Sequence, residues 1–180
     1  ILHCFPGPVL IVQPLSHLTA QLEAGLAGLG LARPGLAARL LDYLALLVQW
    51  NKTFNLTAIR DPEEMLVKHV LDSLSIAPFV TARVADIGTG AGLPGIPLAL
   101  NNPALRVSLV ETVGKKARFL REAVRHLGLD QVTVHACRAE EMPGSGQYDQ
   151  LTARALDTPS GILSMGGHLL RPGGHLLAMM

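Results

Sequence analysis

The sequence predicts an α/β protein in which a parallel sheet follows an N-terminal helical extension. From residue 83 onward, short apolar runs alternate with helical patterns, which is typical of a parallel sheet with helices on both faces. The run Arg83–Ile87 leads directly into closely spaced glycines and then a helical segment. Strand, glycine turn and helix in this order begin a βαβ unit that binds a nucleotide-like ligand. Ahead of residue 81 the apolar residues follow a helical period.

The composition indicates one well-packed domain. The chain has 180 residues, of which 49% are hydrophobic and 16% are charged. A net charge of +1 excludes a strong overall attraction to nucleic acid, so any polyanion site must be a local patch. Cys4 and Cys137 lie far apart without metal-ligand spacing, so we expect no metal site and free thiols in a reducing cytoplasm. We also expect no membrane segment, because no run of about 18 uncharged apolar residues is present.

The first 80 residues divide into a leader and a helical cap. Residues 1–15 are apolar but proline-containing and lack a basic start, so we expect a poorly ordered leader rather than a signal peptide. Helical patterns follow at 16–29 and 34–50. We expect residues 16–80 to form a helical cap that packs as one compact unit with a ligand-binding core at 81–180.

A loop and a third helix complete the cap. Residues 50–57 read as a polar-aromatic loop, and the N-capping aspartate, proline and two acids at 61–64 predict a helix that runs to Ile76. His69 and Asp72 fall on one side of this helix. They either face a cleft or form an internal hydrogen-bond set with Ser73, and the sequence leaves both readings open.

The second part of the chain contains the elements of the sheet. Strands are predicted at 83–87, 106–110, 131–136, 148–153 and 174–179, and helices at 94–101, 114–127 and 157–170. In such sheets the ligand lies at the carboxyl ends of the strands. This places Gly88, Glu111, Ala139 and Arg154 on one rim, since each follows or ends a strand.

The glycine turn favours a cationic ligand. Gly88 and Gly90 belong to a G-x-G-x-G sequence rather than the dinucleotide G-x-G-x-x-G, and Asp86 adds negative charge beside it. Glu111 lies about 20 residues further on, where an acid meets ribose hydroxyls. The pattern therefore favours S-adenosylmethionine over a dinucleotide. The remaining alternative is a turn used for tight packing alone.

Two further loops offer contacts to such a ligand. Ala139 leaves room for an adenine ring, and Glu140 can meet the ring edge; the alternative is an ordinary polar loop. Arg154 stands between alanines at a strand end, where an arginine needs a charged partner. That partner is the donor's carboxylate, an RNA phosphate, or the other half of a structural salt bridge.

The predicted helix at 114–127 is basic. Its five cations, without a matching set of acids, form either a solvated face or a phosphate-binding stripe: Lys115, Lys116, Arg118, Arg121 and Arg125. Lys115 and Lys116 are the better candidates for phosphate contact, because they lie closest to the rim.

These motifs together resemble one family. They are Trp50-Asn51-Lys52 with Asn55-Leu56-Thr57, Arg60-Asp61-Pro62, Lys68-His69-Val70-Leu71-Asp72-Ser73, the run from Asp86 to Leu98 with its Gly-Leu-Pro-Gly-Ile-Pro continuation, Arg138-Ala139-Glu140-Glu141 and Ala153-Arg154-Ala155. Over about residues 36–179 the chain resembles the ribosomal RNA small-subunit methyltransferase G family, also called glucose-inhibited division protein B. The resemblance implies a Rossmann-like class I methyltransferase sheet with added N-terminal helices.

The resemblance also implies an activity and a site. The activity is S-adenosylmethionine-dependent methylation of guanosine N7 in 16S ribosomal RNA, on free RNA or the small ribosomal subunit. The implied donor contacts are Gly88, Leu93, Glu111, Ala139, Glu140 and Arg154, joined by the turn residues Asp86 and Gly90. Because N7 carries a lone pair and no proton, no general base is needed. Arg154, Asp72, His69 and Asn55 are assigned to the substrate side or to loop support, and Lys115, Lys116 and Arg60 to RNA.

The end of the chain departs from the family pattern. The family continues past the fifth strand with a Lys-Gly pair and an antiparallel hairpin, so the last strands are expected to be missing here. We expect a monomer. The alternatives are a class I methyltransferase with another substrate, or a donor-binding module that is inactive through truncation.

Overall fold

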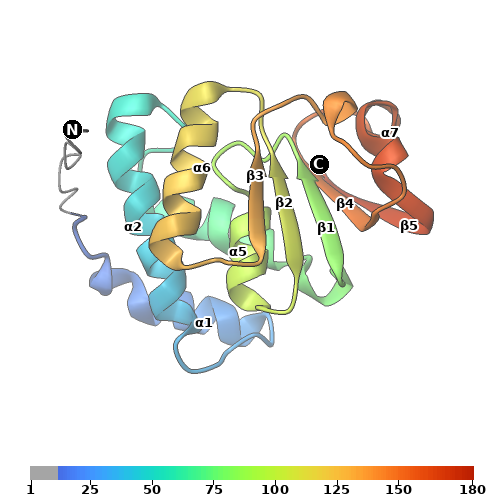
Figure 1. Cartoon of the computed structure of the whole chain (residues 1–180). Coiled ribbons are helices and arrows are strands. Elements are labelled where there is room, and N and C mark those ends of the chain that lie inside the picture. Colours follow the sequence, from blue (N-terminus) through green and yellow to red (C-terminus); the bar gives the residue numbers. More distant parts are fainter. Residues whose placement is uncertain (1–11) are drawn as a thin grey trace, which may run out of the picture.

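A computed structural model describes residues 12–180, and most of the predicted leader lies outside the described residues. Five parallel strands form one sheet: β1 (Arg83–Ile87), β2 (Arg106–Val110), β3 (Val132–His135), β4 (Tyr148–Arg154) and β5 (Leu170–Met179). Their order is β3-β2-β1-β4-β5 (Figure 1). The strand order reverses beside β1, so the glycine turn that follows β1 lies at the switch point where such sheets bind ligands. The predicted parallel sheet is confirmed.

Strand β5 begins earlier than predicted. It starts at Leu170 rather than at 174, and it takes in a Pro-Gly-Gly stretch that reads as a turn in the sequence. The register jumps from Tyr148 opposite Leu170 to Gln150 opposite His175, so the extra residues form an irregularity within the strand. Proline and glycine are tolerated at such a bulge because the ladder is interrupted there.

The N-terminal helices differ from the prediction mainly in length. A 3₁₀ turn (Ser16–Leu18) leads into α1 (Thr19–Gly28), and α2 spans Leu36–Phe54. Helix α2 thus takes in the first half of the loop predicted at 50–57. The reason is aromatic packing: the Trp50 ring lies 5.1 Å from Phe54 and 5.6 Å from Phe119. These contacts extend the buried stripe of the helix by a further turn.

The third helix is continuous but changes its winding. It consists of α3 (Pro62–Met65), a π-helical segment (Leu66–Leu71) and α4 (Asp72–Leu74), followed by a 3₁₀ turn at Ala77–Phe79. Asp61 caps its start, with its carboxylate accepting from the Glu64 amide at 3.1 Å, as predicted. The π segment contains Lys68 and His69. Single π turns inside helices are frequently found at functional sites.

The helices of the sheet region follow the expected order. They are α5 (Gly95–Asn101), α6 (Gly114–Leu127) and α7 (Pro159–Gly166), with 3₁₀ turns at Ala139–Glu141 and Gly167–Leu169. The helix predicted at 157–170 therefore ends four residues early. Its last residue, Gly166, is followed by a second glycine, and two glycines in succession favour the end of a helix.

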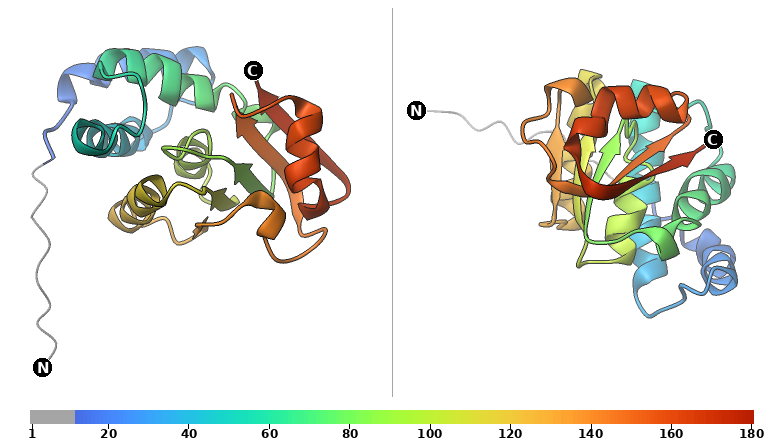
Figure 2. Two further views of the ribbon diagram at one scale, coloured as in Figure 1. Left: turned by 90° about the horizontal axis from the view of Figure 1, so that it is seen from above. Right: turned by 90° about the vertical axis from the view of Figure 1, so that its right-hand side faces the viewer.

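The helices cover the two faces of the sheet unequally. Helices α1 to α6 lie on one face and α7 lies on the other, as the views along the sheet show (Figure 2). One hydrophobic cluster joins the N-terminal helices to α5, α6 and that face of the sheet; Leu22, Leu40, Ile96 and Phe119 belong to it. Leu15, at the end of the predicted leader, is also buried in this cluster. A smaller cluster lies under α7.

Two arginines fasten the N-terminal helices to the sheet region. Arg33 donates to the carbonyls of Leu100 and Asn101 at the end of α5, and Arg39 donates to the carbonyl of Leu127 at the end of α6. The last carbonyls of a helix lack partners within the helix and carry partial negative charge, so both arginines stabilise these ends. In the described part of the chain, no helix is long and apolar enough to cross a bilayer.

Candidate active site

A cavity opens where the carboxyl ends of the strands meet the turn of Ala139–Glu141 and helix α7. Its volume is about 280 Å³, and its walls are Ile87, Gly88, Val110, Thr112, Cys137, Arg138, Ala139, Glu140, Leu156 and Met165. Of the four residues predicted to share one rim, Gly88 and Ala139 line this cavity, whereas Glu111 and Arg154 do not. Glu140, predicted as a donor contact, also lines it. The walls are mostly small or apolar, with polar groups at Thr112, Arg138 and Glu140, as in sites for small ligands.

Gly88 has a backbone conformation that favours glycine. Its φ is +63°, and a Cβ at this position would lie 2.7 Å from Cδ1 of Leu156, which lines the same cavity. Gly90 also has a positive φ, of +61°, but a Cβ there would meet nothing within 4 Å. Gly92, in the same turn, has a positive φ as well, of +93°. The backbone of the turn therefore favours glycine at three positions, and at Gly88 a side chain would also press on the cavity wall.

Asp86, expected to add negative charge beside the ligand, is instead fully buried beneath the turn. Its Oδ2 accepts from the Thr89 hydroxyl at 2.5 Å and the Gly95 amide at 2.9 Å, and its Oδ1 accepts from the Thr152 hydroxyl at 3.0 Å. Burial raises the pKa of Asp86 to about 6, against these hydrogen bonds, which lower it. The Asp86 carboxylate points inward because it accepts hydrogen bonds from buried donors at both ends of the turn.

Glu111 also holds the turn. It is buried, and its two oxygens accept from the amides of Gly90 and Val113, each at 2.8 Å. Glu111 and Gly88 therefore lie on the same rim, as the sequence predicted. Leu93, by contrast, places its side chain in the large hydrophobic cluster rather than in the cavity wall. A contact between Glu111 and a ribose stays a prediction.

Arg154 reaches across to the π segment of the third helix. Its guanidinium donates to the Lys68 carbonyl at 2.9 Å and to Nδ1 of His69 at 3.1 Å, and it lies 3.6 Å from Oδ2 of Asp72. The partners considered for Arg154 from the sequence are a donor carboxylate, an RNA phosphate and a structural salt bridge. The structure shows the salt bridge, with Asp72. The Arg154 side chain nevertheless remains 22% exposed, so one edge of it is open to a ligand.

The hydrogen bonds define the protonation of His69. Because Arg154 donates to Nδ1, this nitrogen is the acceptor and the ring proton lies on Nε2, which is 2.8 Å from the Thr57 hydroxyl. Burial, and then the charge of Arg154, lower the pKa of His69. The imidazole is therefore neutral near pH 7. The side of the helix that carries His69 and Asp72 thus forms an internal hydrogen-bond set, and Ser73 joins it by donating to the His69 carbonyl at 2.5 Å.

Asn55 stands apart from this group. It is exposed at the end of α2 with φ +50°, and its side chain accepts from Arg60. The residue that shapes this loop is Asn51, which belongs to one of the family motifs in the sequence but was not predicted as a site residue. Asn51 is buried, accepts from the Thr57 amide at 2.9 Å and donates to the Ile59 carbonyl at 3.1 Å. The family motif was the available signal, because the burial that makes Asn51 need partners is known only from the packing of α2.

One of the five cations of α6 is paired within the helix. Arg125 forms two hydrogen bonds with Glu122, at 2.6 and 3.0 Å. Lys115 is exposed and Lys116 half-buried at the start of the helix, and neither forms an ion pair with another residue of 12–180. The same residues contain no group of side chains that could hold a metal ion.

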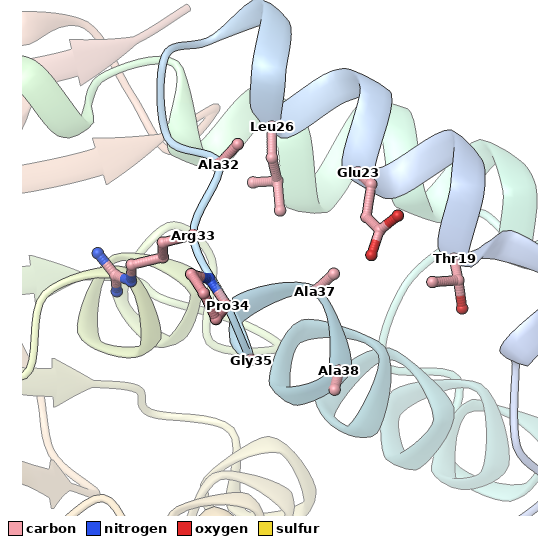
Figure 3. Close-up of a pocket in the computed structure, with 9 residues that line it drawn as sticks. All are labelled: Thr19, Glu23, Leu26, Ala32, Arg33, Pro34, Gly35, Ala37 and Ala38. Atoms are coloured by element: carbon pink, nitrogen blue, oxygen red, sulfur yellow. The ribbon is translucent and has the colours of Figure 1, made fainter.

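A larger cavity of about 540 Å³ lies elsewhere, between α1 and α2 (Figure 3). Its walls include Thr19, Glu23, Arg33 and Gly35. None of the residues predicted to carry chemistry lines it, and Arg33 is already bound to the end of α5. The cavity at the strand ends therefore remains the candidate site.

The fold and the position of the cavity define the class of protein. A methyltransferase from Aquifex aeolicus, described as dependent on S-adenosylmethionine, superposes with a TM-score of 0.54 at 20% identity over 66% of each chain. Another from Thiobacillus denitrificans, solved with S-adenosylhomocysteine, gives 0.51 at 17% identity over 59% of this chain and 46% of that chain. The chain thus has the fold of class I S-adenosylmethionine-dependent methyltransferases.

Sequence comparison gives the family. Residues 36–180 match the family model for rRNA small subunit methyltransferase G. A ribosomal RNA small subunit methyltransferase G from Stenotrophomonas maltophilia (strain K279a) is 62% identical over 165 residues, which cover 91% of this chain and 77% of the relative. One from Xanthomonas euvesicatoria pv. vesicatoria is 59% identical over 163 residues, 90% of this chain and 76% of the relative. The chain belongs to the rRNA small subunit methyltransferase G family.

Proposed function

We propose that this protein transfers a methyl group from S-adenosylmethionine to N7 of a guanosine in 16S ribosomal RNA. The observation that carries the proposal is the cavity beside Gly88, Ala139 and Glu140, at the switch point of a sheet whose family methylates small-subunit rRNA. The donor supplies a methyl group made electrophilic by a positively charged sulfur. In the transfer, the sulfur–methyl bond breaks, a nitrogen–methyl bond forms, and the positive charge moves from sulfur to guanine.

The residues of the cavity suit the parts of the donor. Ala139 has a side chain small enough to leave room for a flat adenine ring, and Glu140 at the same rim is exposed and free to meet its edge. Gly88 clears space for the methionine part. Glu111 binds the ribose hydroxyls through lone pairs that its two oxygens retain, since each oxygen accepts from one amide and can accept a second hydrogen bond. Asp86 supports the turn from below.

The residues near Arg154 orient reactants rather than move protons. The N7 lone pair attacks directly, so the catalytic contribution is to hold the reacting atoms in line. Arg154 keeps one exposed edge for the donor carboxylate or an RNA phosphate, while Asp72 and His69 fix its other edge. Asn55 accepts a hydrogen bond from Arg60 at the end of α2, and we assign Asn55 to support of this loop.

The RNA approaches the rim from the side of α6. Lys115 and Lys116 begin this helix a few residues after Glu111, and they contact phosphates together with Arg60. In an A-form helix N7 lies in the deep and narrow major groove, so the target guanosine is unpaired or in a distorted loop. With a net charge of +1, the enzyme requires a shaped RNA or the small subunit itself. It acts as a monomer in the cytoplasm.

The test is transfer of tritiated methyl groups to small subunits from cells that lack this gene, followed by mapping of the modified base. We expect one guanosine modified at N7. Labelling of a different substrate would show another class I methyltransferase, and donor binding without any transfer would show an inactive binding module. Single-turnover assays of Arg154→Ala and Asp72→Ala test the substrate side: full activity in both variants would remove them from the site.

A further inference from the structure

The hydroxyl of Tyr43 touches the cofactor turn from outside the sheet. Tyr43 lies in the middle of α2 and is fully buried. Its hydroxyl donates to the carbonyl of Ala91, in the turn after β1, at 2.8 Å. Ala91 is itself buried, so water cannot replace this donor. Burial raises the pKa of Tyr43, so its hydroxyl keeps its proton.

Hydrogen bonds hold the turn at several residues, and Tyr43 supplies such a bond from the N-terminal helices. Asp86 of β1 binds Thr89 and Gly95 near the two ends of the turn, and Glu111 after β2 binds Gly90. The next residue, Ala91, is bound by Tyr43. The middle of the turn is therefore held from two sides, at Gly90 by Glu111 and at Ala91 by α2.

Helix α2 is a firm support for this contact. Arg39, one turn before Tyr43, donates to the Leu127 carbonyl at the end of α6. Two turns after Tyr43, the Trp50 ring packs edge-on against Phe119 of α6, with ring centres 5.6 Å apart. Both ends of the segment that carries Tyr43 are thus fixed on the same helix of the sheet region. The hydroxyl has a defined position relative to the turn.

We propose that Tyr43 is a positioning residue of the methyl-donor site, which holds the glycine turn open for the donor through the Ala91 carbonyl. The N-terminal helices are then part of the donor-binding apparatus and not only a cover for the sheet. The inference concerns donor binding; it rests on the proposed function for the identity of the donor and does not depend on the RNA substrate.

The chain offers a matched pair of variants, because it contains two tyrosines and both are buried. Tyr43→Phe removes the bond to Ala91, and Tyr148→Phe removes the bond between the Tyr148 and Ser108 hydroxyls, also 2.8 Å long, within the sheet. Each loses one buried hydrogen bond, so we expect similar decreases in melting temperature. Calorimetric titration with S-adenosylhomocysteine should show a dissociation constant about 3- to 10-fold higher for Tyr43→Phe and within about 2-fold of wild type for Tyr148→Phe.

Equal affinities in the two variants would overturn the proposal, since a purely structural tyrosine lowers the melting temperature alone. The titrations are run at 15 °C with circular dichroism of each variant. Should Tyr43→Phe be partly unfolded, all three proteins are titrated again in sucrose, which favours the folded state. If Tyr43→Phe binds donor product more weakly than wild type and Tyr148→Phe, but the wild type methylates no RNA, the proposed function fails while the role of Tyr43 stands.

Discussion

Replacing Gly88 by alanine tests whether the turn contacts the donor, provided that the effect on binding is distinguished from the effect on folding stability. A matched control lies at the end of α6, where Gly128 has φ +61° against +63° for Gly88. A Cβ at Gly128 would meet nothing within 4 Å, whereas a Cβ at Gly88 would lie 2.7 and 2.9 Å from the two terminal carbons of Leu156. The two substitutions share a backbone strain and differ in what the new methyl group touches.

The energetic terms can be estimated for both. An L-residue in the left-handed region costs about 1–2 kcal/mol. The loss of unfolded-state entropy on replacing glycine by alanine returns about 0.4–1 kcal/mol. Leu156 is 41% exposed and can move aside, so its clash adds little. Each variant should therefore lose about 1 kcal/mol of unfolding free energy, or about 2–4 °C in melting temperature.

Binding should distinguish the two variants. The methyl group of Gly88→Ala, and the displaced Leu156, take space inside the cavity. We expect the affinity for S-adenosylhomocysteine, measured by calorimetry, to fall more than about tenfold in Gly88→Ala and to stay within about twofold in Gly128→Ala. Equal affinities, at equal melting temperatures, would refute the placement of the donor against Gly88.

Three further predictions concern charge. Because the folded pKa of Asp86 is raised to about 6 from 3.8, the folded chain binds the extra proton between these values, and the Asp86 contribution to stability falls as pH rises from 4 to 6.5. Urea titrations of wild type and Asp86→Asn measure this contribution as the difference between their unfolding free energies. The difference should fall by up to about 3 kcal/mol over this range, and a constant difference would contradict the raised pKa of the buried Asp86 carboxyl. His69 has a lowered pKa, so its contribution to the unfolding free energy is present above pH 6.5 and is lost as pH falls below that value. In Arg154→Ala the His69 pKa, followed by NMR of the ring, should rise; an unchanged pKa would contradict the contact between Arg154 and His69. Lys115→Glu should lower RNA methylation several-fold and weaken its salt dependence while sparing donor binding. The equal charge change Arg106→Glu, on an exposed residue at the opposite ends of the strands, should leave methylation unchanged; equal effects would place the RNA elsewhere.

The sequence predicted the sheet well because its signals are local. The apolar runs of β1 and β2 were placed to the residue, and the glycines after Asp86 indicated the edge of the sheet at which the cavity opens. The rim formed by Gly88, Glu111 and Ala139 follows from topology, since parallel strands end on the same side.

The contacts of charged residues could not be predicted in the same way. Asp86 turns inward because Thr152, on the neighbouring strand β4, offers a hydroxyl at 3.0 Å, and this pairing depends on register across the sheet. Arg154 meets Lys68 and His69, which lie more than 80 residues earlier in the chain. Such partners become neighbours only when the third helix is packed against the sheet, and its π winding has no signal in the sequence that we can identify.

A crystal structure with S-adenosylhomocysteine tests the central claim most directly. The product should lie in the cavity after β1, with its adenine against Ala139 and its ribose hydroxyls on Glu111. Density for the product in the larger cavity between α1 and α2, or a strand-end cavity that stays empty at saturating product, would contradict the assignment.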